Sequence, residues 1–237
     1  LINKKLDFKN KSKSQVDPVT KFDLLIEKKI RSFIKRNFST HNIIGEEFEK
    51  VKKNSLYEWY IDPIDGTKAL VMGLNSWSNL IGLFFKGGPI LSFANFPCLN
   101  KYYYAYGNDA FVFDKNKIRK LKASKKISLT RPLLAMNTIS SNQNISLFKK
   151  LKNKYFIKIT GIDALNYCLL CEGKIDVVIE SGLKKVDFFP LIKLIRNSGG
   201  VITDWNGKQK FSKGDVLVSR NKKLHKSFLK QFKRWKY

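Results

Sequence analysis

Two aspartates lie close together within residues 59–67, which read Trp-Tyr-Ile-Asp-Pro-Ile-Asp-Gly-Thr. Asp62 and Asp65 offer carboxylate oxygens, the hard ligands that bind cations such as Mg²⁺. Gly66 and Thr67 add backbone N–H groups at a glycine turn that opens into a helix, an arrangement that cradles an anion. A metal site beside a phosphate site is typical of metal-assisted phosphoester hydrolysis. Because Asp-Pro and Asp-Gly are also common turn dipeptides, a plain sharp connection is the alternative interpretation.

Three other segments carry carboxylates that could join the same site. Glu46 lies in a Gly-Glu-Glu segment directly after an apolar pair, although glutamates at a strand end are usually solvated. Asp23 stands three residues after Thr20 at the start of a helical apolar pattern, a spacing that equally fits a capping box. Asp187 precedes a helical segment that ends in Ser-Gly-Gly, where a helix N-cap is the ordinary role. Only the combination of these segments points to a common site.

Taken together and in this order, the four segments resemble the inositol monophosphatase superfamily of Mg²⁺-dependent phosphatases. That family shows Gly-Glu-Glu, then Asp-Pro-Ile-Asp-Gly-Thr after a strand, then an Asp that opens a late helix closing on Gly-Gly. The resemblance extends from about residue 16 to the C-terminus. Within the superfamily, the sequence is most similar to the histidinol-phosphate phosphatase branch. Three stretches carry this similarity: 82–84 with 87–89, Gly161-Ile-Asp163 with Tyr167, and 180–184 with 199–205.

The sequence departs from its relatives just before Asp187. Members of the histidinol-phosphate branch usually carry Pro-Tyr there, and most inositol phosphatases have a Trp. This chain has Lys185-Val186 instead. We therefore expect the aromatic wall beside the metal site to be missing, a difference that concerns the substrate more than the chemistry.

The resemblance implies a set of metal ligands and catalytic groups. The implied ligands are four carboxylates and one backbone carbonyl: Glu46, Asp62, Asp65, Asp187 and the carbonyl of Ile64. Four converging carboxylates would repel one another unless cations lay between them, so two or three Mg²⁺ ions are expected. The implied catalytic residues are Asp23, Glu46 and Thr67, of which the Asp23 carboxylate and the Thr67 hydroxyl orient the attacking water. The N–H groups of Gly66 and Thr67 would hold phosphate oxygens.

The C-terminal half is expected to read the rest of the substrate. Glu180 ends an apolar run and matches a family position that contacts the alcohol part of the substrate, and Asp163 is the second candidate. Histidinol phosphate offers an amine and an imidazole, both able to carry positive charge, which suits two carboxylates. An inositol ring would instead need neutral donors and acceptors. For Asp163, a helix N-cap is the alternative role.

Histidine and cysteine chemistry is not indicated. The chain has only two histidines, His41 and His225, neither in a catalytic context, and both are expected at the surface. Direct attack by water is therefore favoured over a covalent intermediate. Cys168 and Cys171 fall inside an apolar helical pattern, so plain packing is favoured over zinc binding or redox activity.

Composition limits the other classes of function. The chain has 237 residues, 43% of them hydrophobic, and a net charge of +27. No apolar stretch approaches the ~20 residues of a spanning helix, and a cytoplasmic location is expected. The charge could suit a basic nucleic-acid-binding protein without catalysis, the alternative from another class. Lysines are spread along the whole sequence, however, which favours a compositional bias over a dedicated nucleic-acid site. Relatives are commonly dimers, so a homodimer is possible.

The resemblance implies a layered αβαβα sandwich that mixes α+β and α/β elements, with metals held where two halves meet. In residues 1–127 we expect a strand near 58–62, followed by an antiparallel meander of strands near 77–85, 90–96, 102–106 and 110–113. In residues 128–237 we expect strands near 133–136, 155–159, 176–180, 201–203 and 216–219, with helices near 146–152, 164–172, 188–198 and 222–231. The sequence thus predicts a Mg²⁺-dependent phosphomonoesterase whose leading substrate is histidinol phosphate. Inositol monophosphate, or another small sugar or nucleotide phosphate, is the alternative.

Overall fold

Two β-sheets organise the chain. The structure, a computed structural model, describes all residues except 1–6, 12–17, 124–131, 137–141, 160 and 236–237. The larger sheet has seven strands in the order β3-β4-β5-β6-β7-β8-β9. Its strands are β3 (Asn42–Gly45), β4 (Tyr57–Asp65), β5 (Ser78–Phe85), β6 (Gly88–Phe96), β7 (Lys101–Tyr106), β8 (Asp109–Asp114) and β9 (Lys117–Lys120). From β4 onward every neighbouring pair is antiparallel, which confirms the predicted meander.

The smaller sheet has five strands in the order β11-β10-β12-β14-β13. These are β10 (Leu133–Met136), β11 (Phe156–Ile159), β12 (Val177–Glu180), β13 (Val201–Thr203) and β14 (Val216–Ser219). β10 pairs in parallel with β11 and β12, whereas β14 runs antiparallel to β12 and β13. A separate two-stranded ribbon, β1 (Phe8–Asn10) with β2 (Pro18–Thr20), precedes the first helix.

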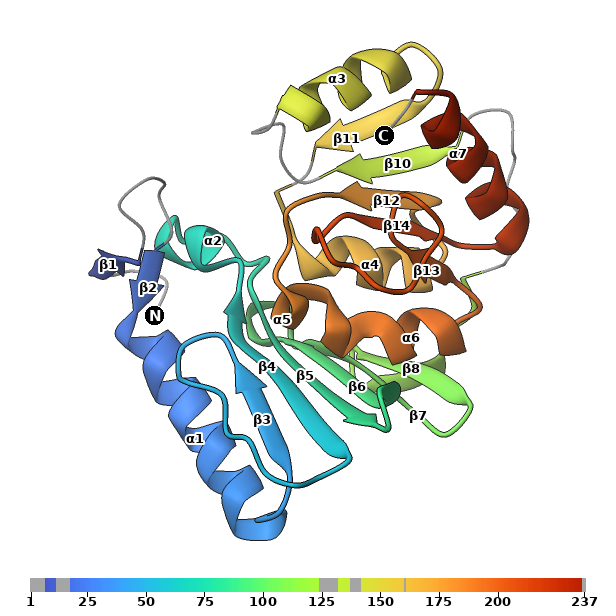
Figure 1. Cartoon of the computed structure of the whole chain (residues 1–237). Helices are drawn as coiled ribbons and strands as arrows, with labels where there is room; N and C mark the ends of the chain where they lie inside the picture. Colours follow the sequence, from blue (N-terminus) through green and yellow to red (C-terminus); the bar gives the residue numbers. More distant parts are fainter. Residues whose placement is uncertain (1–6, 12–17, 124–131, 137–141, 160, 236–237) are drawn as a thin grey trace.

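Helices cover both sheets and fill the space between them (Figure 1). α1 (Lys21–Asn37) lies on the outer face of the larger sheet. A middle layer contains α4 (Ala164–Cys171), α5 (Lys185–Phe188), a 3₁₀ turn (Phe189–Leu191) and α6 (Ile192–Asn197). α3 (Asn142–Leu151) and α7 (Lys222–Arg234) cover the far face of the smaller sheet, and the short α2 (Thr67–Val71) follows β4. This αβαβα layering confirms the predicted fold class.

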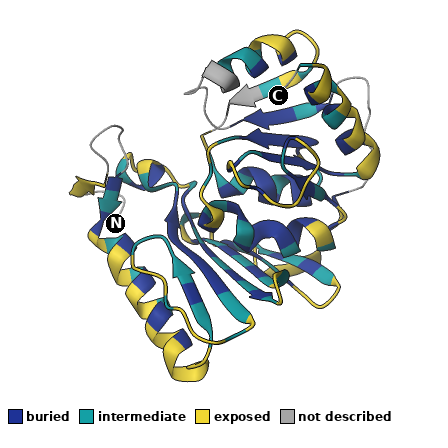
Figure 2. Cartoon of the chain, viewed as in Figure 1, coloured by how far each residue is buried: buried dark blue, intermediate teal, exposed yellow. Residues whose placement is uncertain are grey.

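The core lies mainly between the larger sheet and the middle helices. Side chains of β5 alternate between buried and half-buried, as expected when one face of a strand meets the core. Leu80 and Phe96 from the larger sheet pack in one cluster with Leu170 of α4 and Phe188 of α5. Figure 2 shows the same concentration of buried residues between the two sheets. Cys168 and Cys171 are buried in this core as free thiols, in line with the packing role expected for them.

Several predicted elements differ from the structure. The helix expected over 188–198 is three short pieces that begin at Lys185, because Pro190 lacks an N–H and restricts the residue before it. β9 was not expected, since its residues are charged and exposed and show no apolar alternation. His225 is buried rather than at the surface, and burial lowers its pKa to about 4. The predicted boundary between residues 127 and 128 lies outside the described residues. Among the described helices, none is both long and apolar enough to cross a membrane.

Candidate active site

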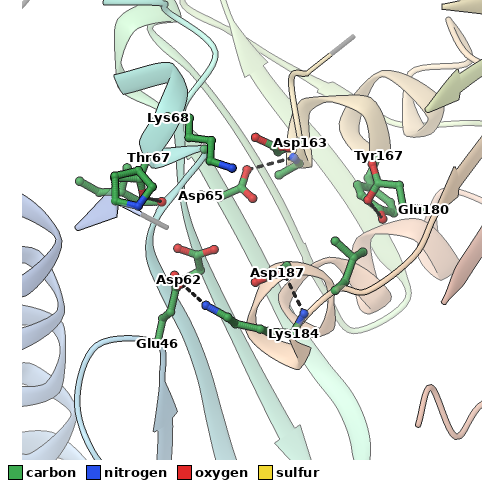
Figure 3. Close-up of a pocket in the computed structure, with 15 residues that line it drawn as sticks. Glu46, Asp62, Asp65, Thr67, Lys68, Asp163, Tyr167, Glu180, Lys184 and Asp187 are labelled. Atoms are coloured by element: carbon green, nitrogen blue, oxygen red, sulfur yellow. Dashed lines mark hydrogen bonds and ion pairs between the residues drawn. The ribbon is translucent and has the colours of Figure 1, made fainter. Parts of the chain in front are cut away.

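The end of β4 carries the two aspartates of the central motif. The pairing of β4 with β5 shifts register between Asp62 and Asp65, which marks a β-bulge or similar irregularity. Such bulges re-aim side chains at the rim of a sheet. The amide of Asn79 donates to the Pro63 carbonyl at 2.6 Å and so satisfies the backbone within this irregular stretch. Both aspartates are buried, and both face one cavity (Figure 3).

The glycine turn after β4 is required by its conformation and by a close neighbour. Gly66 has a φ of 81°, a left-handed conformation that strongly favours glycine. A Cβ atom at this position would also lie 3.1 Å from Oδ2 of Asp163. Gly66 forms the N-cap of α2, so Thr67 is the first residue of that helix. The turn predicted from the sequence is therefore present, and it brings its backbone to the wall of the same cavity.

The first turn of α1 connects Thr67 to Asp23. Asp23 is fully buried, and its Oδ2 accepts hydrogen bonds from the Thr20 backbone N–H at 2.8 Å and the Thr20 hydroxyl at 2.6 Å. Its other oxygen, Oδ1, lies 3.2 Å from the Thr67 hydroxyl, which also lies 3.0 Å from the Ile64 carbonyl. The capping box is thus present. It uses one carboxylate oxygen and leaves the second for Thr67, so the two interpretations of Asp23 are compatible.

A buried ion pair fixes the segment that carries Glu46. Glu27 of α1 accepts from Arg31 Nε at 2.6 Å and from the Glu47 backbone N–H at 2.7 Å. A Cβ atom on Gly45 would meet Glu27 Oε1 at 2.0 Å, so any other residue at this position of Gly-Glu-Glu would displace the Glu27 carboxylate from its pair with Arg31. Glu46 follows directly and reaches the cavity wall.

Asp187 enters the cavity from the opposite side, on α5. Its Oδ2 accepts from the Lys184 backbone N–H at 2.8 Å, so it caps the helix from within the first turn rather than from the N-cap position. The side chain of Lys184 crosses the cavity, and its Nζ donates to Glu46 Oε1 at 3.0 Å (Figure 3). Lys11 Nζ lies 3.2 Å from the same Glu46 oxygen.

The cavity has a volume of about 250 Å³ and brings together nearly all the predicted site residues. Its lining residues are Pro18, Glu46, Asp62, Ile64, Asp65, Gly66, Thr67, Lys68, Asp163, Ala164, Tyr167, Glu180, Leu183, Lys184 and Asp187. Asp23 alone of the predicted set does not line it and lies behind Thr67. Sequence reasoning assigned no role to Lys68, Tyr167 or Lys184. Lys68 directly follows the central motif, and the other two lie in the stretches that resemble the histidinol-phosphate branch.

Burial and mutual repulsion change the pKa values of the carboxylates in the cavity. Burial, together with Glu46, Asp65 and Asp187, raises the pKa of Asp62 well above its ordinary range. Burial and Asp163 likewise raise the pKa of Asp65. The pKa of Asp187 rises to about 7 because it is buried and close to Glu46. At Glu46, burial is outweighed by Lys11 and Lys184, and the pKa is lowered.

These residues fit a divalent cation chemically. Asp62 Oδ1 is buried and has no hydrogen-bond partner in the described part of the chain. A cation would satisfy that oxygen and relieve the repulsion that raises the pKa values of its neighbours. No group of three or more acidic, His or Cys side chains among the described residues is already arranged to hold a metal ion. The ammonium group of Lys184 reaches Glu46 instead, so metal binding would require these two side chains to separate.

The substrate end of the cavity carries Glu180 and Asp163. Glu180 is 4% exposed, and its Oε2 accepts from the Tyr167 hydroxyl at 2.5 Å. Its Oε1 has no partner among the described residues, and burial raises the pKa of the carboxyl to about 8. Asp163 occupies the N-cap position of α4, yet its side chain makes no cap hydrogen bond. Its φ of 38° is unusual for a residue other than glycine and indicates local backbone strain at the cavity.

An αβαβα sandwich with an acidic cavity between its two sheets is the architecture of the sugar-phosphatase fold class. The sequence matches the inositol monophosphatase family over residues 2–237, and the chain belongs to that family. The bifunctional phosphatase IMPL2, chloroplastic, of Arabidopsis thaliana is 33% identical over 199 residues, which cover 83% of this chain and 57% of that protein. The histidinol-phosphatase of Mycobacterium tuberculosis is 29% identical, with coverage of 94% and 88%. A solved IMPase/NADP phosphatase complexed with Mg²⁺ and phosphate superimposes with a TM-score of 0.83 at 23% identity, covering 95% of this chain and 85% of that chain.

Proposed function

We propose that this chain is a Mg²⁺-dependent phosphomonoesterase that hydrolyses a small phosphorylated metabolite. The observation that carries the proposal is the convergence of four carboxylates and the Gly66-Thr67 turn on one cavity, with Asp62 Oδ1 buried and unpaired among the described residues. Glu46, Asp62, Asp65, Asp187 and the Ile64 carbonyl would hold Mg²⁺. When bound, the ions would neutralise the phosphate, stabilise the leaving oxygen and lower the pKa of a bound water. The solved IMPase/NADP phosphatase, which is complexed with Mg²⁺ and phosphate, supports this choice of ion.

The chain's own residues supply positioning. The N–H groups of Gly66 and Thr67 hold phosphate oxygens at the start of α2. The Thr67 hydroxyl, 3.2 Å from Asp23, orients a water toward phosphorus and passes a proton toward the carboxylate. The water oxygen bonds to phosphorus as the ester P–O bond breaks, and the leaving alkoxide takes a proton from solvent, so the products are inorganic phosphate and an alcohol. Positioning and electrostatics supply most of the rate in such transfers, so no protein nucleophile is needed.

The favoured substrate is histidinol phosphate. Glu180 and Asp163 provide carboxylates at the far end of the cavity, which suits an amine or imidazolium group. Glu180 Oε1 is an acceptor without a partner among the described residues, so a ligand that donates a hydrogen bond would relieve the cost of its burial. The name of the Mycobacterium relative supports this substrate. Inositol monophosphate, or another small sugar or nucleotide phosphate, is the alternative within the family.

A phosphate-release screen tests the proposal. Wild-type protein with Mg²⁺ is offered histidinol phosphate, inositol monophosphate and a nucleoside monophosphate, and we expect the highest kcat/KM for histidinol phosphate. At about pH 9, where the Glu180 carboxyl is mostly ionised, Glu180→Gln should raise KM for histidinol phosphate more than for inositol monophosphate, because only the first ligand carries positive charge. Turnover of inositol monophosphate at the higher rate would reassign the substrate. Absence of Mg²⁺-dependent release from all three would overturn the phosphatase assignment.

A further inference from the structure

A second cavity of about 650 Å³ adjoins the acidic one and shares two of its wall residues, Glu46 and Lys184. It lies between the edge strand β3, the segment that follows it, the start of β4 and the first turn of α5. Its lining residues are Asn42, Ile44, Gly45, Glu46, Lys50, Val51, Lys52, Lys53, Glu58, Tyr60, Lys184, Lys185 and Val186. We refer to it as the lysine groove.

Positive charge dominates this groove. Five lysines line it, against only two glutamates. Glu46 is already paired with Lys184 and Lys11. Glu58 is close to Tyr60, and burial together with this carboxylate raises the pKa of the Tyr60 hydroxyl to about 12. Within the described part of the chain, no acidic side chain pairs with Lys50, Lys52 or Lys53. Lysine groups gathered in a concave site attract small anions, and phosphate in particular.

Hydrogen bonds to β3 hold the segment that carries Lys50, Lys52 and Lys53. Ile43 of β3 and Val51 exchange two backbone hydrogen bonds, of 3.0 and 2.9 Å, so Lys50 and Lys52 flank a residue tied to the sheet. The Asn42 side chain accepts from the Lys53 backbone N–H at 2.6 Å and donates to the Ser55 carbonyl at 2.8 Å. These contacts hold the lysines along one wall and reduce the entropy lost when an anion binds.

The two residues that precede Asp187, Lys185 and Val186, form the opposite wall of the lysine groove. Val186 is 5% exposed and presents only a small side chain to the groove. Lys185 is drawn aside, with its Nζ 5.3 Å from the centre of the Phe189 ring. A large aromatic residue at either position would fill part of this space. The departure from the Pro-Tyr or Trp of the relatives therefore leaves the groove open, next to the acidic cavity.

We propose that the lysine groove binds a phosphate-class anion, as a second site beside the acidic cavity. The anion is either a second phosphoryl group on a substrate held in the acidic cavity or a separate phosphate ion. In both cases Lys184 is within reach of the ligand and of Glu46. An anion in the groove would draw this ammonium away from Glu46 and leave that carboxylate available to a cation. Groove binding and cation binding should then favour each other, and such coupling is reciprocal.

The groove is tested with inorganic pyrophosphate as the probe, by isothermal titration calorimetry in the presence of a chelator. The site variant is K50Q/K52Q/K53Q, and the matched control is K223Q/K226Q/K230Q, which removes the same charge from the exposed face of α7. We expect the site variant to bind pyrophosphate about tenfold more weakly, whereas the control changes less than about twofold. Equal losses in the two variants, or no binding to the wild type, would overturn the proposal.

A second variant tests the position without changing charge. Val186→Trp should fill the groove and weaken pyrophosphate binding by a similar factor, and undiminished binding by folded Val186→Trp protein would overturn the location. The source of the anion is distinguished by comparing a sugar bisphosphate with its monophosphate. A preference for the bisphosphate that disappears in K50Q/K52Q/K53Q identifies a second substrate group, and equal binding of the two sugars identifies a separate ion. No turnover is measured, so the outcome is independent of the proposed phosphatase activity.

Discussion

Two neighbouring cavities of this chain have opposite electrostatic character. Six acidic residues line the acidic cavity, whereas five lysines line the lysine groove. The pair formed by Glu46 and Lys184, 3.0 Å apart, belongs to the walls of both. One cavity therefore needs cations from solution and the other attracts anions, and the shared ion pair lets each site influence the other.

Burial explains why the two cavities should respond differently to mutation. Asp62 and Asp65 are buried, so their charges act in a medium of low polarity and strongly perturb each other. Lys50, Lys52 and Lys53 are exposed, and solvent and salt screen them. Single changes in the acidic cavity should therefore have large effects, whereas the groove needs several changes at once.

The largest effect is expected for Asp62→Asn. This change keeps the shape of the side chain but removes a predicted metal ligand. We expect Mg²⁺-dependent phosphate release to fall roughly 10³-fold, because metal ions supply several kcal/mol of transition-state stabilisation. Circular dichroism should show an intact fold, since the change also removes a buried carboxylate that repels its neighbours. Unchanged turnover would remove Asp62 from the ligand set.

The next largest effect on activity is expected when the hydrogen bond between Thr67 and Asp23 is removed. Thr67→Val removes the hydroxyl that lies 3.2 Å from Asp23 while retaining the branched shape. We expect kcat to fall roughly 10²-fold, the usual contribution of a positioned proton-transfer group. Thr67→Ser is the matched control and should keep most of the activity. If Thr67→Val and Thr67→Ser lose activity equally, the methyl group matters rather than the hydroxyl.

The acidic cavity also predicts how stability depends on pH. The pKa of Asp187 rises from an ordinary 3.8 to about 7 in the folded protein, and that of Glu180 rises from 4.5 to about 8. The folded chain thus binds more protons than the unfolded chain between these values, so the free energy of unfolding falls as the pH rises through this window. Without metal, we expect Tm to fall by more than about 10 °C between about pH 5 and about pH 8.

Mg²⁺ should reverse this loss mainly at the higher pH, where Asp187 is mostly ionised and able to bind it. Thermal melts with chelator and with Mg²⁺ measure both effects, and Asp187→Asn should flatten the metal-free profile. A metal-free Tm that rises over this range would contradict the assignment of repelling carboxylates.

The smallest effect is expected for Lys184, which lines both cavities. Lys184→Gln removes the ammonium group that pairs with Glu46, so Mg²⁺ should bind roughly twofold to fivefold more tightly. Lys185→Gln is the control, because it removes the same charge from the adjacent residue, whose Nζ lies over Phe189 instead. Mg²⁺ titration measures both variants. Equal changes in affinity would show a general charge effect and would contradict coupling of the two cavities through the Glu46–Lys184 pair.

Much of the fold could be predicted from local patterns. The meander of β5 to β8 follows from alternating apolar residues separated by turn residues. The helix expected near residues 222–231, observed as α7, follows from an apolar face at helical spacing, and the same face explains why the surface position predicted for His225 was wrong. His225 lies with Leu224 and Phe228 on the buried side of α7. Its two ring nitrogens form hydrogen bonds with the hydroxyls of Thr203 and Ser219.

The candidate site was predictable in its residues but not in its contacts. The motif at residues 59–67 identified Asp62 and Asp65, and the family resemblance added Glu46 and Asp187. The contact between Glu46 and Lys184 joins residues 138 positions apart, which no local pattern encodes. The lysine groove could not be predicted either, because lysines occur throughout the sequence and only the fold selects which of them meet.

Calorimetric titration of the chelator-treated wild type and of Asp62→Asn with Mg²⁺, at about pH 8 where Asp187 is mostly ionised, tests the central claim most directly. We predict saturable binding to the wild type that is lost in Asp62→Asn, with both proteins folded. Identical binding by the two proteins, or no binding by the wild type, would contradict a metal centre in the acidic cavity.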